Sequence, residues 1–220
     1  MNNNINQQTT KAGRVRSLFG AALLLVCAFG TVNTAGAQVT PPTTPDLIAV
    51  PAGNSAFLVG HAFGSQGYTC LPTSTGATAW NPAARPEATL FTDFFGHPVQ
   101  IITHFQSINA NPKPDVIPPL SGNATWQSSF DTSRVWAVKD KGIDPSSDIA
   151  SCSHTGSIQC LLLKSVGNLK GPTGGSLLAN TTFIQRLNTN GGAVPTTACT
   201  AGQTQLAPYT ADYFFFRADN

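Results

Sequence analysis

The chain has 220 residues, of which only 10% carry a charge, with 12 Lys and Arg against 10 Asp and Glu. So few charges, without a basic run, exclude a nucleic-acid-binding protein, whose surface needs clustered Lys and Arg to contact phosphates. After Gln38 no stretch of eighteen residues is continuously apolar, so we expect no membrane anchor in the mature chain.

The first 37 residues have the layout of a secretory signal peptide. Three basic residues precede an apolar run over residues 18–30 that is short for a membrane span, and small residues follow at 35–37. We expect cleavage near Ala37 and a mature protein that is secreted or periplasmic. The remaining 183 residues carry nine basic and ten acidic side chains, a length that suits one domain.

Residues 38–54 are rich in proline, and we expect them to form an extended, poorly packed N-terminal arm because proline removes amide donors. Residues 55–220 are predicted to form a single all-β domain, a sandwich or barrel with long irregular loops. Short runs rich in β-branched and aromatic residues recur there between Gly, Pro and Asn breakers, as is typical of such folds. These runs are 56–59, 68–71, 88–91, 99–105, 124–127, 134–138, 158–164, 181–187 and 209–216.

The last run, 209–216, has almost no polar side chain on either face. Its odd positions are Tyr, Ala, Tyr and Phe, and its even positions end in two Phe, so we expect a central strand covered on both sides. Two long irregular stretches, 107–123 with four prolines and 167–180 with four glycines, are either functional loops or plain connections.

Four cysteines remain after the leader, and an even number in an oxidising compartment predicts two disulfide bonds. Four cysteines allow three pairings. We favour Cys152 with Cys160, which closes a short turn region, and therefore Cys70 with Cys199, which joins early and late chain. A zinc site formed by Cys152, His154 and Cys160 is the alternative, but it lacks the usual paired spacing and would face oxidation. We therefore expect no metal.

Seven short sequence blocks between residues 56 and 216 are fairly specific in combination. They are Gly-Tyr-Thr-Cys at 67–70, Pro-Glu-Ala-Thr-Leu at 86–90, Thr-His-Phe at 103–105, Ala-Thr-Trp at 124–126, Leu-Leu-Leu-Lys at 161–164, Phe-Ile-Gln-Arg-Leu-Asn-Thr at 183–189 with Gly-Gly at 191–192, and Pro-Tyr-Thr-Ala-Asp-Tyr at 208–213. Together they resemble the secreted family known as domain of unknown function 3455. The resemblance implies a β-rich extracytoplasmic protein and no established activity. Where the family commonly has an acidic residue this chain has Gln127, which weakens a carboxylate-based mechanism.

Motifs for catalysis and cofactor binding are missing from the sequence. No serine has the Gly-x-Ser-x-Gly flanks of a hydrolase elbow, and the glycines at 60, 64 and 67 lack the spacing of a dinucleotide fingerprint, so we expect no cofactor. If the protein is an enzyme, His104 is the candidate general base, with Asp93 or Asp212 as its carboxylate partner. The interpretation that we favour for His104 is a hydrogen-bonded, half-buried structural residue on a strand.

Three aromatic residues and one arginine are candidate ligand-binding groups. Trp126, Tyr68 and Tyr209 could form a platform, since rings with a polar edge stack on sugars, although core filling is the simpler explanation. Arg186 lies in an apolar run, where we expect it to pair with a carboxylate such as Asp212 or to bind an anionic ligand.

The favoured function is a binding or surface-associated module for a carbohydrate or a cell-envelope component. It would act through the loops 107–123 and 167–180 and through exposed aromatic residues. A small hydrolase or lyase built on His104 is the first alternative, and a purely structural envelope protein is the second.

Overall fold

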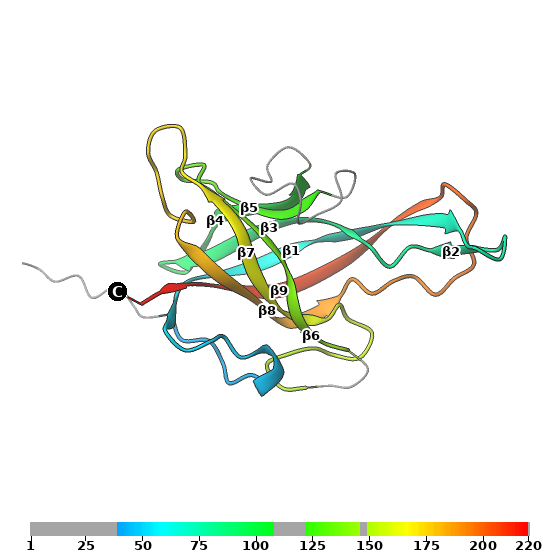
Figure 1. The fold of residues 1–220 in the computed structure, drawn as a ribbon, viewed down its shortest axis with the longest axis horizontal. Coiled ribbons are helices and arrows are strands. Elements are labelled where there is room, and N and C mark those ends of the chain that lie inside the picture. Colours follow the sequence, from blue (N-terminus) through cyan, green and yellow to red (C-terminus); the bar gives the residue numbers. More distant parts are fainter. Residues whose placement is uncertain (1–38, 108–121, 146–148, 220) are drawn as a thin grey trace, which may run out of the picture. The chain divides into compact units, whose positions relative to one another are not determined.

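The computed structural model describes residues 39–107, 122–145 and 149–219, which form nine strands and one 3-10 helix (Figure 1). The predicted signal peptide and residues 108–121 of the first candidate loop lie outside the described residues. The elements are η1 (Asp46–Ile48), β1 (Asn54–Pro72), β2 (Thr78–Trp80), β3 (Arg85–Phe94), β4 (His97–Ser107), β5 (Asn123–Ser128), β6 (Arg134–Ile143), β7 (Cys160–Leu169), β8 (Thr181–Gly191) and β9 (Thr204–Ala218).

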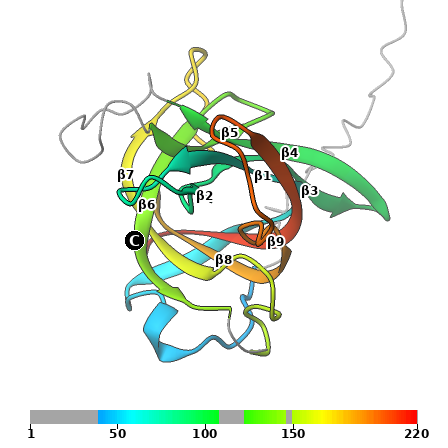
Figure 2. The ribbon, with the colours of Figure 1, turned by 90° about the vertical axis from the view of Figure 1, so that its right-hand side faces the viewer.

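Eight of these strands close into an antiparallel barrel. The order around the ring is β1-β3-β4-β5-β6-β7-β8-β9, and β9 pairs back onto β1, with partners from Asn54 to Thr69 (Figure 2). Strand β2 stays outside the ring and pairs with the last three residues of β1. The all-β prediction is confirmed, and the barrel is the architecture that forms, which leaves no unpaired edge in the ring.

Strand β1 is longer than the sequence pattern suggests. The predicted runs 56–59 and 68–71 belong to one strand of 19 residues, which the glycines between them do not interrupt. A Cβ atom at Gly64 would lie 2.1 Å from the carbonyl oxygen of Glu87 on β3, so glycine allows the two strands to approach closely. The other seven predicted runs each overlap one strand, whereas β2 has no counterpart among them.

Strand β9 is covered on both sides, as predicted. Its odd positions from 209 to 215 belong to the core inside the barrel. Phe214 and Phe216 face outward and pack in a second cluster with Ile48 of the N-terminal arm. Ile48 is fully buried, and its carbonyl oxygen accepts a hydrogen bond from Gln185 Nε2 at 2.7 Å. The arm that we expected to be poorly packed therefore covers part of the outer face of the barrel.

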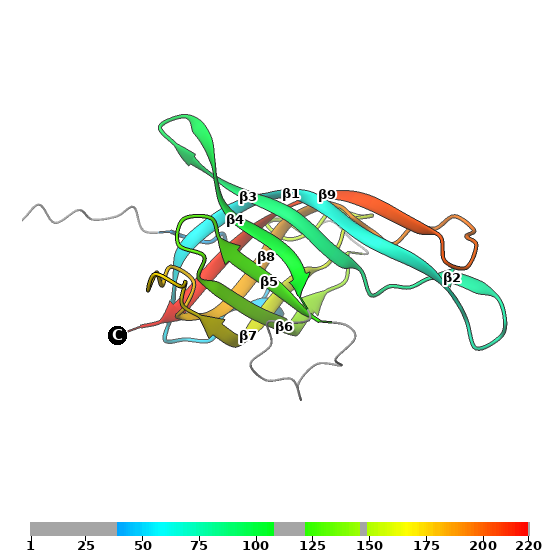
Figure 3. The same cartoon turned by 90° about the horizontal axis from the view of Figure 1, so that it is seen from above.

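The barrel has two ends, which we call the pocket end and the clamped end. At the pocket end β1, β4, β6 and β8 finish and β3, β5, β7 and β9 begin, because all neighbours are antiparallel. Figure 3 shows β1 and β9 running side by side toward β2 on that side of the molecule. The strands joined by residues 107–123 meet at the pocket end, whereas those joined by 167–180 meet at the clamped end. The strand ends that the two candidate loops connect therefore lie at opposite ends of the barrel.

The clamped end is held by Asp131 in the turn between β5 and β6. Its Oδ2 accepts a hydrogen bond from the backbone N–H of Leu177 at 2.8 Å, and its Oδ1 accepts from Ser133 N at 3.0 Å and Ser133 Oγ at 2.7 Å. A Cβ atom at Gly175 would lie 2.3 Å from the Cβ atom of Asp131, so the loop between β7 and β8 packs closely on the turn between β5 and β6. Leu178 of the same loop is fully buried in the barrel core.

Candidate functional site

A pocket of about 580 Å³ lies at the pocket end of the barrel. Its walls come from β1, from the residues before β3, from the chain between β6 and β7, and from β8 with the residues that follow it. The volume falls in the range of pockets that bind small molecules. The polar residues of its lining are Gln66, Tyr68, Asp144, Ser157, Gln159 and Arg186.

Arg186 points to the inner side of β8, because it is in register with Leu161 and Tyr213, both of which are core residues. Its Nε donates a hydrogen bond to the carbonyl oxygen of Gln159 at 3.0 Å. The expected pairing of Arg186 with Asp212 is wrong, since Asp212 faces the outer side of β9. Among the residues that the structure describes, Arg186 has no carboxylate partner.

Gln66 and Tyr68 bring two polar groups from β1 to the pocket. The Tyr68 hydroxyl donates a hydrogen bond to the carbonyl oxygen of Gly192 at 2.7 Å. Burial raises the pKa of Tyr68, and the charge of Arg186 partly offsets that rise. Gln66 is only 4% exposed, and its Nε2 has no hydrogen-bond partner. A buried amide N–H without a partner costs about 1 to 3 kcal/mol, so this donor is the unusual feature of the pocket.

Both predicted disulfide bonds form, and both hold segments that line the pocket. The bond between Cys70 and Cys199 ties the segment after β8 to the end of β1. Trp80 Nε1 adds a hydrogen bond to the carbonyl oxygen of Thr197 at 2.9 Å. The second bond, between Cys152 and Cys160, closes the segment that supplies residues 157–159 to the pocket. The walls are therefore covalently fixed on two sides.

The three candidate ligand-binding aromatics are buried and form no exposed platform. Trp126 is 1% exposed, and Tyr68 and Tyr209 are each 3% exposed. The hydroxyl groups of Tyr209 and Tyr213 lie 3.2 Å apart, and burial raises the pKa of Tyr209. Trp126 stacks on His104 with ring centroids 4.1 Å apart. Of the three candidates, Tyr68 alone is part of the pocket lining.

His104 is a buried residue of the barrel interior, 2% exposed, with Nδ1 placed 2.9 Å from the carbonyl oxygen of Thr125. Burial lowers the pKa of His104 to about 3; the hydrogen bond to Thr125 raises it, and the charge of Arg186 lowers it further. The ring is therefore neutral near pH 7. Asp93 lies near the last residue of β3, at the clamped end of the barrel, where its Oδ1 accepts a hydrogen bond from Gly96 N at 2.9 Å. The structure does not bring His104 and Asp93 together.

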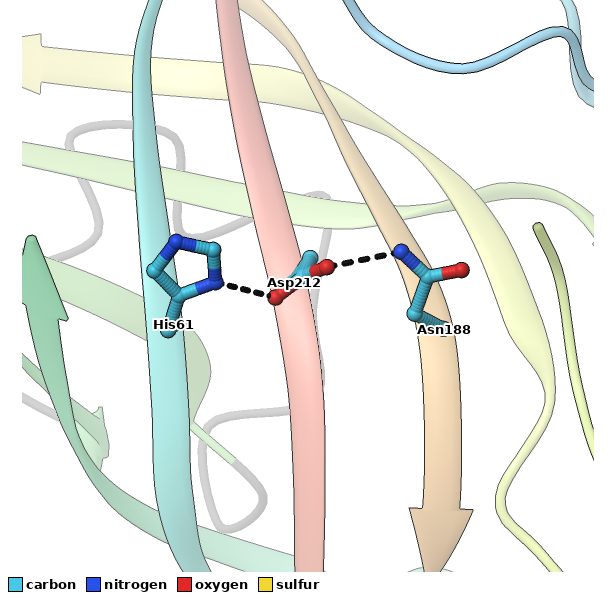
Figure 4. Close-up of polar contacts among 3 residues, drawn as sticks. All are labelled: His61, Asn188 and Asp212. Atoms are coloured by element: carbon cyan, nitrogen blue, oxygen red, sulfur yellow. Dashed lines mark hydrogen bonds and ion pairs between the residues drawn. The ribbon is translucent and has the colours of Figure 1, made fainter.

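Asp212 belongs to a polar cluster on the outer face of the barrel (Figure 4). Its Oδ1 lies 2.6 Å from His61 Nδ1, and its Oδ2 accepts a hydrogen bond from Asn188 Nδ2 at 2.7 Å. His61 is on β1 and Asn188 on β8, so the carboxylate of Asp212 connects three adjacent strands. Because Asp212 faces outward and His104 inward, this second proposed partner also does not contact the histidine.

A closed all-β barrel with two disulfide bonds and a polar pocket at one end is the class of protein that these observations define. The model of a family described as protein of unknown function (DUF3455) matches residues 51–217. The chain belongs to this family, which confirms the resemblance drawn from the seven sequence blocks. No curated protein and no solved structure matches the chain.

Across the described part of the chain, no group of three or more His, Cys, Asp or Glu could hold a metal ion. No helix within the described ranges is long and apolar enough to cross a membrane.

Several residues of the pocket are not among those that the sequence analysis selected. Gln66 lies two positions before Tyr68 on the same strand, so alternation alone places the two side chains on one face. That signal could have identified Gln66. Asp144, Ser157 and Gln159 come from the chain between β6 and β7, and only the three-dimensional fold brings them to the pocket.

Proposed function

We propose that this protein is an extracytoplasmic binding protein that holds a small polar molecule in the pocket at the end of the barrel. A saccharide or another cell-envelope component is the class of ligand that we favour. The observation that carries the proposal is the Nε2 group of Gln66, a buried donor without a partner in the lining of a 580 Å³ pocket. A bound molecule with an acceptor atom would satisfy this donor, which is why such groups often mark binding sites.

The two disulfide bonds support a location in an oxidising compartment, where such bonds persist. They also support binding, because a pocket whose walls are already fixed loses less conformational entropy when a ligand enters. Catalysis by His104 with Asp93 or Asp212 receives no comparable support, since the three side chains bond to different partners.

The test is a binding screen of neutral and acidic saccharides and other cell-envelope fragments by thermal shift and calorimetry. Two variants control for the place of binding. Val194→Trp puts an indole at the pocket, and Leu177→Trp makes the same kind of change at the clamped end; both parent side chains are 37% exposed.

We expect a ligand to raise the Tm of the parent protein and of Leu177→Trp. Val194→Trp should bind the same ligand at least about tenfold more weakly, which corresponds to a loss of about 1.4 kcal/mol. Equal binding by Val194→Trp, or the failure of every compound to bind, would contradict the proposal.

A further inference from the structure

We infer that the ligand of the pocket carries a carboxylate group, and that Arg186 is its counter-ion. This inference rests on the proposed function, because it assigns a chemical class to the molecule that the same pocket would hold. It starts from the state of the Arg186 side chain, which is half-buried and has no carboxylate partner among the described residues.

The guanidinium group of Arg186 uses one donor within the described structure. Its Nε donates to the carbonyl oxygen of Gln159, which fixes one edge of the planar group against the start of β7. Arginine has five N–H donors in a rigid arrangement, and the pair of terminal nitrogens matches the two oxygens of a carboxylate. An arginine held in this way by its Nε is already oriented for a bidentate contact.

The neighbouring polar groups of the pocket favour a ligand that accepts hydrogen bonds. Gln66 Nε2 is a second donor without a partner, and the Tyr68 hydroxyl already donates to Gly192. Lys139 donates from its Nζ to Oε1 of the lining residue Gln159 at 2.6 Å, but it is not itself part of the lining. Among the described residues that line this pocket, Arg186 is the cationic side chain.

The charge of the lining favours a carboxylate over a phosphate ester. Arg186 supplies one positive charge, and Asp144, an exposed residue of the same lining, supplies one negative charge. A phosphate monoester carries about 1.5 to 2 negative charges at pH 7, more than the single positive charge of the lining itself. A carboxylate carries one, and the Asp144 carboxylate can accept hydrogen bonds from hydroxyl groups elsewhere on the ligand. The ligand class is therefore a hydroxylated carboxylic acid, such as a sugar acid.

The test compares matched acids and neutral amides on the parent protein by calorimetry at pH 7. The probes are D-glucuronate, D-galacturonate, D-gluconate and N-acetylmuramate, each beside its primary amide, with glucose 6-phosphate as the phosphate arm. We expect binding of at least one acid and, for its amide, an affinity lower by roughly 10- to 100-fold, as for loss of a charge-assisted contact.

Arg186→Gln should lower affinity for the same acid by a similar factor, whereas Lys164→Gln, which removes one exposed positive charge on β7, should not. Far-UV circular dichroism confirms that both variants are folded. If an amide or neutral sugar binds as well as its acid, or if the phosphate binds better, the carboxylate assignment is wrong while the proposed pocket stands, provided that Val194→Trp abolishes this binding. If no probe of any class binds, the proposed function fails together with this inference.

Discussion

The two ends of the barrel order their loops in different ways. At the clamped end, the carboxylate of Asp131 accepts hydrogen bonds from Leu177 and Ser133, so a side chain of the β5–β6 turn holds the loop 167–180 through hydrogen bonds. At the pocket end, two disulfide bonds fix the walls, and Gln66 Nε2 is buried without a partner. Buried donors without a partner occur at both ends, since Arg134 Nε at the start of β6 has none either, but among the described residues Gln66 is the one that belongs to a residue lining the pocket of about 580 Å³.

The largest effect is expected from removing the bond between Cys70 and Cys199. Cys70→Ser combined with Cys199→Ser opens a closure with a sequence separation of 129, for which the chain-entropy model gives a loss of about 4 to 5 kcal/mol. Cys152→Ser with Cys160→Ser opens a separation of 8 and should lose only about 2 to 3 kcal/mol. Urea unfolding measures both double variants. Equal losses would show that covalent closure is not what stabilises the pocket end.

At the clamped end, Leu178→Ala tests whether buried apolar packing stabilises this end as the disulfide bonds stabilise the pocket end. Leu178 is fully buried in the core, so its truncation should lower the free energy of unfolding by about 3 kcal/mol. Val194→Ala, at the rim of the pocket, should change it by less than about 0.5 kcal/mol. The comparison breaks down if urea unfolding gives the two variants similar stability.

The buried His104 should make the free energy of unfolding fall in mild acid. Burial lowers the pKa of His104 to about 3 from 6.5, so the unfolded chain binds a proton first as the pH falls. The stability from this group is complete above pH 6.5 and is lost between pH 6.5 and 3. At pH 5 the loss should be about 2 kcal/mol.

His104→Phe should flatten this dependence, which thermal unfolding at several pH values measures. His97→Phe, at an exposed position on the β3–β4 hairpin, is the control and should keep the slope of the parent protein. An unchanged slope in His104→Phe would mean that another group causes the acid sensitivity.

Asp131→Asn tests the carboxylate at the clamped end. Burial acts to raise the pKa of Asp131, but the hydrogen bonds from Leu177, Ser133 and Ser128 together lower it to about 2. Its contribution is therefore present above pH 3.8, the ordinary value, and is lost as the pH falls toward 2. Because the group is only partly buried, we expect a loss of about 1 to 2 kcal/mol at pH 7.

Hydrogen exchange at the Leu177 amide should become faster in Asp131→Asn, whereas Asp140→Asn, an exposed acidic position on β6, should have no effect there. Unaltered protection of Leu177 in Asp131→Asn would show that this carboxylate is not what holds the loop.

The smallest effect on stability is expected from Gln66→Met at the pocket end. Methionine fills similar space and removes a buried donor without a partner, so the free energy of unfolding without ligand should change by no more than about 0.5 kcal/mol, or rise. Urea unfolding provides the measurement. A loss above about 2 kcal/mol would mean that Gln66 supports the fold rather than a ligand.

The fold was largely predictable because its signals are local. Alternation in residues 209–216 predicts a central strand with two covered faces, and β9 is such a strand. The two disulfide pairs follow from spacing and from an oxidising compartment. Strand β2 escapes prediction because its three residues are too few to show a period.

The site was less predictable, because it depends on which strands become neighbours. An apolar run around Arg186 suggests a buried carboxylate partner, but strand register places Asp212 on the opposite face of the sheet. An imidazole before a long loop suggests a base, yet His104 lies inside a closed barrel, where burial keeps it neutral. Closure of β9 onto β1 is a long-range event that no local pattern in either strand specifies.

The most direct test of the account is nuclear magnetic resonance of the 15N-labelled protein during titration with the best ligand from the binding screen. The account predicts that the side-chain amide signals of Gln66 and the Nε–H signal of Arg186 shift and saturate together. The backbone amide of Leu177, which is hydrogen-bonded to Asp131 at the other end, should not move. Shifts confined to the clamped end, or an unchanged Gln66 amide at saturation, would contradict the assignment of the pocket as the binding site.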